Sequence, residues 1–290
     1  MRYRIDMSYS GAGFCGWQVQ PSEPSVQEAL EKALCTLLRT EVGVVGAGRT
    51  DTGVNASFYV AHFDFDAPVP GPLLADSGGK GGALDCRQLC YKLNAILPKG
   101  ASVSAIAPAA PDFHARFDAR LRQYTYYLHR RKDPFLGSMS YFFAYPEFDV
   151  AAMNRAAALL LGTHDFSCFE KSGGDNKTSV CTVFSARWEP YEPELHAPVP
   201  APPCSSSSPL CAGCPGDPQY WRFVIEADRF LRNMVRAIVG TLLEVGRGRR
   251  SEDSFASLIL PAGTCVRESS RSLAGESVPA HALYLTDIRY

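Results

Sequence analysis

A glycine-rich loop that carries one carboxylate is the feature of this sequence best suited to chemistry. The run Gly46-Ala-Gly-Arg-Thr-Asp-Thr-Gly53 places Asp51 among three glycines. Glycine lets a backbone turn sharply and approach a ligand closely, and a carboxylate held there can act as a nucleophile or as a general base. The same composition would also suit a plain hairpin or a phosphate cradle. Asp51 is therefore a candidate catalytic residue with structural alternatives beside it.

Three other kinds of functional loop share part of this composition. A Walker loop needs Gly-Lys followed by Ser or Thr, which the run lacks, and a dinucleotide loop opens a helix, whereas a strand is predicted here. Asp51-Thr-Gly53 equals the active-site triplet of aspartic proteases, with Asp76-Ser-Gly78 as its only mate. Those enzymes take one carboxylate from each of two similar lobes. Triplets 25 positions apart (76 − 51) are too close for that, so an aspartic protease ranks as the weaker hypothesis.

The first part of the chain predicts a ferredoxin-like order of elements around this loop. Residues 3–7 alternate apolar and polar side chains, which is typical of a half-buried strand. Ser25-Val-Gln-Glu28 is a capping box that predicts the start of a helix, and apolar residues continue on one face through Leu38. Further strands are predicted at 42–45, 58–65 and 102–107, and a helix at 85–96. The order is β-α-β-β-α-β.

The second part repeats that order. Strands are predicted at 120–129, 180–188, 220–227 and 282–288, and helices at 149–161 and 230–245, with a short extra helix at 252–260. We therefore predict an α+β protein whose two ferredoxin-like halves, 1–110 and 111–290, form an extended, mostly antiparallel sheet with a central active-site cleft. Two Pro-rich segments, 68–82 and 189–218, interrupt the pattern and are predicted to be loop insertions.

Two short segments are basic in a chain whose net charge is only −1. Residues 112–132 hold six Arg or Lys against two Asp, a balance of +4, and residues 229–250 hold six Arg against one Glu, a balance of +5. Either segment alone would be interpreted as a solvated face, but two of them can form one positive groove for phosphates.

No stretch approaches the roughly 20 apolar residues of a membrane span, and the N-terminus lacks the apolar centre of a signal peptide. We therefore expect a cytoplasmic protein without a membrane segment. The ten cysteines are scattered, which favours reduced thiols in such a chain. Cys204, Cys211 and Cys214 contain a lone Cys-x-x-Cys without a second pair or a nearby histidine, so no metal site is predicted.

Many ordered motifs resemble those of the tRNA pseudouridine synthase A family. Ala47-Gly-Arg-Thr-Asp-Thr-Gly-Val54 is similar to that family's Ala-Gly-Arg-Thr-Asp-Ala-Gly-Val signature. Thr52 and Asn55 stand where the family usually has Ala and His, and Ala282 where it usually has Gly. The other matching motifs are Gly16-Trp-Gln18, Ser25-Val-Gln-Glu28, Asn94-Ala-Ile-Leu-Pro98, Asp112-Phe-His-Ala-Arg116, Arg122-Gln-Tyr-Thr-Tyr126, Phe230-Leu-Arg-Asn-Met-Val-Arg236 with Val239-Gly240, and Pro279-Ala280 with Leu283-Tyr-Leu285.

This resemblance implies an isomerase that converts uridine to pseudouridine at positions 38 to 40 of tRNA. It assigns Asp51 as the catalytic carboxylate, Arg236 as its cationic partner and Tyr124 as the active-site tyrosine. It further implies that Arg49, Leu283 and Arg232 bind substrate, although a surface arginine and a core leucine are the plain alternatives. The isomerisation involves no redox step, so no cofactor is expected.

The resemblance also implies a homodimer that binds tRNA across basic surfaces of both subunits. An alternative from another class is an RNA-binding module that has lost catalysis, because paired ferredoxin-like sheets often bind RNA. The presence of Asp51, Arg236 and Tyr124 together favours the enzyme.

Overall fold

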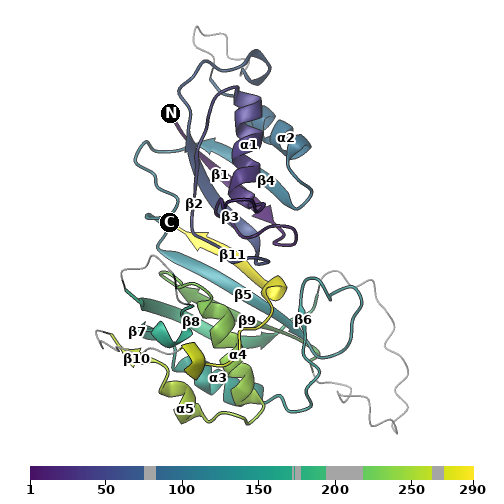
Figure 1. Cartoon of the computed structure of the whole chain (residues 1–290), viewed down its shortest axis with the longest axis vertical. Coiled ribbons are helices and arrows are strands. Elements are labelled where there is room, and N and C mark those ends of the chain that lie inside the picture. The colour runs from purple at the N-terminus through teal and green to yellow at the C-terminus, as the bar shows by residue number, and fades with distance from the viewer. Residues whose placement is uncertain (75–82, 172, 174–177, 194–217, 263–270) are drawn as a thin grey trace. The chain divides into compact units, whose positions relative to one another are not determined.

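The computed structural model describes residues 1–74, 83–171, 173, 178–193, 218–262 and 271–290 (Figure 1). These residues divide into two compact units, Met1–Gln123 with Tyr284–Tyr290, and Tyr124–Leu283. Much of the two predicted insertions, including Cys204, Cys211 and Cys214, lies outside the described residues. Within the described part of the chain, no helix is both long and apolar enough to cross a membrane.

The first unit is a mostly antiparallel sheet covered on one face by two helices. Its strands follow the order β11–β3–β1–β4, with β2 paired to β3. Figure 1 shows α1 and α2 side by side over this sheet. The strands are β1 (Arg2–Tyr9), β2 (Val44–Gly46), β3 (Asn55–Asp64), β4 (Ala101–Pro108) and β11 (Leu283–Arg289), and the helices are α1 (Val26–Leu38) and α2 (Cys86–Ile96), with a short 3-10 turn, η1 (Gly71–Leu73).

Local sequence signals account for how these elements begin. The Ser25 hydroxyl accepts a hydrogen bond from the Glu28 amide at 3.2 Å, as the capping box predicts. Asp85 caps α2 in the same way, accepting from the amides of Arg87 and Gln88. In β1, buried side chains alternate with half-exposed ones along the whole strand, so one face packs under the helices and the other remains polar.

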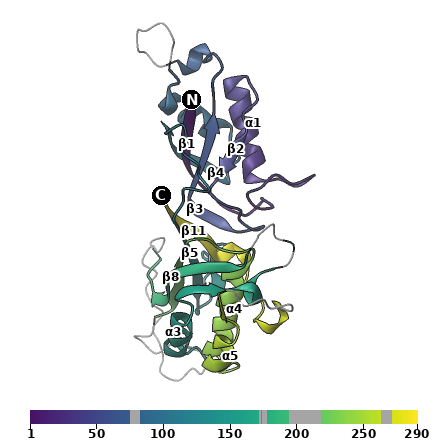
Figure 2. The ribbon, with the colours of Figure 1, turned by 90° about the vertical axis from the view of Figure 1, so that its left-hand side faces the viewer.

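The second unit has the strand order β10–β7–β8–β9–β5, with β6 paired to β5. Figure 2 shows its helices α3, α4 and α5 gathered on one face of the strands. The strands are β5 (Leu121–His129), β6 (Tyr141–Phe142), β7 (Gly162–Asp165), β8 (Val180–Pro190), β9 (Tyr220–Ala227) and β10 (Leu260–Pro261), the helices are α3 (Val150–Ala158), α4 (Met234–Gly246) and α5 (Glu252–Ala256), and 3-10 turns lie at η2 (Ser167–Phe169), η3 (Arg271–Leu273) and η4 (Ala280–Ala282).

The predicted α+β class and the mostly antiparallel pairing are confirmed. The last predicted strand, β11, pairs in parallel with β3, with Tyr284 opposite Asn55. The two compact units are divided inside β5, between Gln123 and Tyr124. The short strands β6, β7 and β10 were not predicted, because two to four residues carry too little periodicity.

The helix predicted at 230–245 begins later, at Met234. Asn233 before it has a left-handed backbone with φ = 64°, which ends the preceding turn and cannot continue an α-helix. Leu231, one of the apolar side chains that suggested an earlier start, is buried in this turn, and the Met234 amide donates to the Leu231 carbonyl at 3.1 Å.

Candidate active site

The Asp51 loop connects β2 to β3 in the first unit. The Val54 amide donates to the Asp51 carbonyl at 3.1 Å, and Gly53 has φ = 78°. A β-turn with positive φ at its third residue is the conformation for which glycine is the favoured residue. The turn leaves the Asp51 side chain half-buried and Arg49 exposed.

Three aromatic side chains support this loop from the sheet and from the segment before α1. The Tyr59 hydroxyl donates to the Gly48 carbonyl and accepts from the Gly48 amide at 3.3 Å. The hydroxyls of Tyr9 and Thr50 lie 3.0 Å apart. Trp17 stacks on Tyr59 with ring centroids 4.2 Å apart. All three rings are buried, so the residues flanking Asp51 are held by fully packed groups with few alternative rotamers.

The backbone around the loop is packed too closely for larger residues. A Cβ on Gly16, whose φ is 92°, would lie 2.4 Å from the Thr50 carbonyl oxygen, and one on Gly11 would lie 2.4 Å from the Gly53 carbonyl carbon. The Gly11 amide donates to Asn55 Oδ1 at 2.8 Å. Asn55 therefore bonds the segment after β1 to the start of β3, beside the Asp51 turn.

Arg122 joins the Asp51 loop to the first basic segment. Its Nη2 atom donates to the Ala47 carbonyl at 2.9 Å and to the Arg116 carbonyl at 2.7 Å. Nε lies 3.3 Å from the same Ala47 oxygen, and Nη1 lies 3.2 Å from the Ala119 carbonyl. A planar guanidinium with five donors can bond three carbonyls at once. Arg122 therefore holds the loop and the segment 112–122 in a fixed position relative to each other.

Arg236 lies in the first turn of α4 in the second unit and is half-buried. Its Nε atom donates to the Val278 carbonyl at 2.8 Å, and the Val278 amide donates to the Arg236 carbonyl at 3.3 Å. The contact fixes the plane of the guanidinium through one nitrogen. The terminal nitrogens are therefore oriented by the segment before η4.

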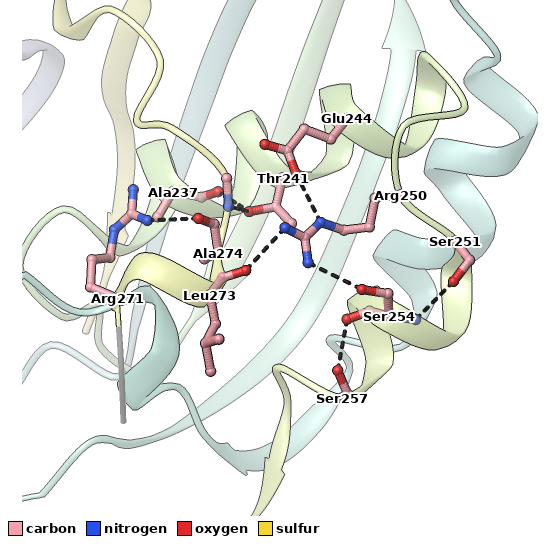
Figure 3. Close-up of polar contacts among 11 residues, drawn as sticks. Ala237, Thr241, Glu244, Arg250, Ser251, Ser254, Ser257, Arg271, Leu273 and Ala274 are labelled. Atoms are coloured by element: carbon pink, nitrogen blue, oxygen red, sulfur yellow. Dashed lines mark hydrogen bonds and ion pairs between the residues drawn. The ribbon is translucent and has the colours of Figure 1, made fainter. Parts of the chain in front are cut away.

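That segment, residues 271–278, is fastened along α4 at several points (Figure 3). The Thr241 hydroxyl donates to the Ala237 carbonyl at 2.7 Å and accepts from the Gly275 amide at 2.9 Å. Arg250 pairs with Glu244 at 2.8 Å and donates to the Leu273 carbonyl at 3.0 Å (Figure 3). These hydrogen bonds hold residues 271–278 against α4. Val278, whose carbonyl accepts from Arg236, is the last residue of this segment.

Closer to Arg236, the Ser277 hydroxyl joins two further side chains. It accepts from Asn233 Nδ2 at 2.7 Å and from Arg271 Nη2 at 2.8 Å. Burial lowers the pKa of Arg271, Glu244 opposes that shift, and the positive charge of Arg236 acts in the same direction as burial. A second cation so near makes an anionic partner favourable for Arg236.

The other predicted site residues of the second unit also have defined surroundings. Tyr124 is buried, with its ring edge-on to Phe230 at a centroid distance of 5.1 Å. Leu283 is buried directly after η4. Arg232 is exposed, and its carbonyl accepts from the Lys171 amide at 3.0 Å.

Five residues of these surroundings were not singled out as site residues from the sequence. Tyr9 continues the buried alternation of β1 and could have been found by extending that pattern. Tyr59 and Gly11 give no local signal. Trp17 and Arg122 lie in motifs that resemble those of the family. Their hydrogen bonds to Thr50 and Ala47 nevertheless join residues 33 (50 − 17) and 75 positions apart. Only the tertiary fold brings them to the Asp51 loop.

The described residues contain no group of three or more His, Cys, Asp or Glu arranged to hold a metal ion. Cys204, Cys211 and Cys214, for which the sequence predicts no metal site, are not among these residues. The groups at the loop are a carboxylate, cations, phenols and backbone amides, a set suited to acid–base or nucleophilic chemistry on a polar substrate.

Comparison with known proteins agrees with this set of groups. A family model described as tRNA pseudouridine synthase matches residues 156–290. The tRNA pseudouridine synthase A of Parabacteroides distasonis is 42% identical over 289 residues, which cover 100% of this chain and 96% of that protein. The enzyme of the same name from Bacteroides fragilis is 41% identical, with the same coverage, and that from Chlorobaculum tepidum is 33% identical over 288 residues, 99% of this chain and 97% of that protein.

These relatives define the class of protein as an isomerase that makes pseudouridine. More narrowly, the chain belongs to the tRNA pseudouridine synthase A family. This membership excludes an aspartic protease.

Proposed function

We propose that this chain isomerises uridine to pseudouridine at positions 38 to 40 in the anticodon stem-loop of tRNA, with Asp51 as the catalytic carboxylate. The observation that carries the proposal is the Asp51 loop, which three buried aromatic residues and Arg122 hold in one conformation. A preset carboxylate loses little entropy when it meets the substrate.

The reaction requires that the bond between N1 and C1′ break and that a bond between C5 and C1′ form. The hydrogen on C5 leaves as a proton and N1 gains one, so the product is an isomer and no external oxidant or reductant takes part. An ionised carboxylate near the sugar–base junction can attack C1′ or remove a 2′ hydrogen. Asp51 is proposed for this role in either route.

Arg236 is proposed as the cation that pairs with Asp51 during the reaction. Desolvation in a closed pocket opposes ionisation of a carboxylate unless a positive charge stabilises it. The support for this role is the fixed guanidinium of Arg236 and the second cation, Arg271, linked to it through the Ser277–Val278 segment.

Tyr124 and Leu283 are proposed to flank the target base. A phenol presents a flat face for stacking and a hydroxyl for a hydrogen bond or proton transfer, and a leucine offers an apolar contact. Arg232, exposed at the start of α4, is proposed to contact a phosphate of the tRNA.

Arg49 is proposed to fill the space that the target base leaves when it turns out of its stack, a step that costs a few kcal/mol. Its exposure two residues before Asp51 is consistent with a contact to folded RNA. We expect Arg49→Ala to keep full activity on a single-stranded uridine oligomer and to lose activity on folded tRNA. Parallel time courses of pseudouridine formation on the two substrates measure this, and equal losses on both would contradict the role.

The positions modified can be tested with tRNA whose uridines at 38, 39 and 40 are replaced singly by cytidine. We expect each replacement to remove pseudouridine at that position only, because the product forms in place of the original base. Nucleotide-resolution mapping of the treated tRNA measures the result. Pseudouridine that appears only outside positions 38 to 40 would contradict the proposed site specificity while leaving the isomerase activity intact.

We further propose that the protein acts as a homodimer in the cytoplasm. The basic segments 112–132 and 229–250 are the surfaces on which each subunit would hold tRNA phosphates. Sedimentation of the purified protein with and without tRNA tests the dimer, and a monomer in both would contradict it. Cell fractionation tests the location.

A further inference from the structure

The first basic segment presents an aromatic and cationic platform on the surface of the first unit. Phe117 has 74% of its surface exposed. The His114 ring lies beside the Phe117 ring, with centroids 4.3 Å apart and planes at 32°. The Arg116 guanidinium lies 5.7 Å from the Phe117 ring centroid. We call these three residues, His114, Arg116 and Phe117, the platform.

Hydrogen bonds hold the backbone of the platform from both sides. The Ala115 amide donates to His62 Nδ1 at 3.1 Å, and the Tyr290 hydroxyl donates to the Ala115 carbonyl at 2.8 Å. Asp118 Oδ2 accepts from the His114 amide at 2.8 Å. The loop is therefore tied to β3 and to the residue after β11.

The His114 ring is itself fixed by the loop. Its Nδ1 atom accepts hydrogen bonds from the amides of Arg116 and Phe117, each at 3.2 Å. The ring of His62 lies edge-on to it at 5.0 Å. The backbone and the His114 ring beside Phe117 are thus preset, so a planar group that stacks here orders few further groups.

Exposure alone does not indicate a ligand, but the Phe117 ring is flanked by an imidazole and a guanidinium, and an aromatic face beside a cation is the arrangement on which bases stack next to a phosphate. Within the first unit, residues 112–123 hold three Arg against two Asp, a balance of +1 (3 − 2), and the Arg116 cation beside the ring favours an anionic ligand. An unpaired nucleotide satisfies both features, because it has a flat base beside a negative phosphate.

We propose that an unpaired base of the tRNA stacks on Phe117 while Arg116 binds an adjoining phosphate. The proposal rests on tRNA as the substrate but not on the role of Asp51. Arg122 donates hydrogen bonds to the carbonyls of both Arg116 and Ala47. A base stacked on the platform therefore has a fixed position relative to the Asp51 loop.

Binding of unmodified tRNA to Phe117→Ala, Phe117→Leu and Phe117→Trp tests the stacking directly. We expect alanine to raise the Kd between about 5-fold and 150-fold, the range for one base–aromatic stack. Leucine should lose nearly as much, because it keeps apolar area without a flat face, and tryptophan should bind as well as wild type. Phe135→Ala is the matched control, since Phe135 is also 74% exposed and belongs to the second unit.

The dependence of Kd on salt separates the ring from the cation. A phosphate contact contributes a slope of roughly −0.7 to −0.9 in log K against log salt. We expect Phe117→Ala to displace the line without changing its slope and Arg116→Gln to reduce the slope by about that amount.

Three results would overturn the proposal. The first is a Kd for Phe117→Ala within about 2-fold of wild type, which is below the smallest stacking loss. The others are equal losses in Phe117→Ala and Phe135→Ala, and wild-type binding by Phe117→Leu. Sedimentation of Phe117→Ala adds a fourth, because a change in oligomeric state would assign the ring to a contact between copies of the chain. All these measurements report binding and not the rate of reaction, so failure of the Asp51 assignment would not affect them.

Discussion

Asp51→Asn is expected to reduce the single-turnover rate of pseudouridine formation by at least about 1,000-fold, as for loss of a catalytic nucleophile or base. The amide has nearly the same shape as the carboxylate but cannot supply its charge or accept a proton at neutral pH. The contacts that hold the loop involve the side chains of Tyr9, Tyr59 and Arg122 rather than that of Asp51, so the loop should keep its conformation.

The affinity of Asp51→Asn for unmodified tRNA should remain within about 3-fold of wild type, because the loss is one of chemistry and not of uniform binding. Thermal unfolding and tRNA binding of the variant provide these controls. Asp66→Asn is the matched variant, since Asp66 is an exposed carboxylate just beyond β3, and it should react at the wild-type rate. A rate for Asp51→Asn within about 10-fold of wild type would exclude Asp51 as nucleophile or general base.

Arg236→Gln is expected to lower the single-turnover rate on the order of 100-fold, the loss typical of removing one group that stabilises charge in an active site. The affinity for tRNA should change far less. Arg236→Lys keeps the charge but lacks the planar fork that the Val278 carbonyl orients, so we expect it to recover only part of the rate.

The division of the loss between rate and affinity gives a readout that a phosphate-binding role would not produce. Arg249→Gln removes an equal charge from an exposed position of the same basic segment and should weaken affinity without lowering the single-turnover rate. Losses of Arg236→Gln that are confined to affinity would contradict the ion pair.

Tyr124→Phe serves as a comparison for both variants, since it keeps the ring packed on Phe230 and removes only the hydroxyl. A loss of rate with unchanged affinity would assign the hydroxyl a part in proton transfer. An unchanged rate would leave Tyr124 with stacking alone.

Local signals in the sequence predicted the elements that position the site. The Ser25 capping box and the Asp85 cap lie within three residues of the amides they satisfy, so the start of each helix was visible. The turn at Asp51 was visible for the same reason, because Gly53 supplies the positive φ that the turn needs.

Contacts between distant residues were not predictable in this way. The aromatic support of the Asp51 loop draws on Tyr9, Trp17 and Tyr59, three residues whose spacing follows no single period. Likewise, β11 fits the pattern of a closing strand, but its pairing with β3 joins Tyr284 to Asn55. Pairing across so many residues depends on the tertiary fold and not on propensity.

The contacts of residues 271–278 with α4 were likewise not predictable from the sequence. Gly240 and Gly275 look like breaks in the pattern, whereas each permits a close approach: a Cβ on Gly240 would lie 1.8 Å from the Glu276 carbonyl oxygen, and one on Gly275 would lie 2.6 Å from Glu244 Oε1. The hydrogen bond from Arg236 to the Val278 carbonyl could not be inferred from the resemblance of the Arg236 motif alone.

The most direct test of the central claim is nucleotide-resolution mapping of pseudouridine in unmodified tRNA after incubation with the wild-type protein and with Asp51→Asn. We predict new pseudouridine at positions 38 to 40 with wild type and none with the variant, although both bind the tRNA. No new pseudouridine with wild type, or an equal yield with Asp51→Asn, would contradict the account.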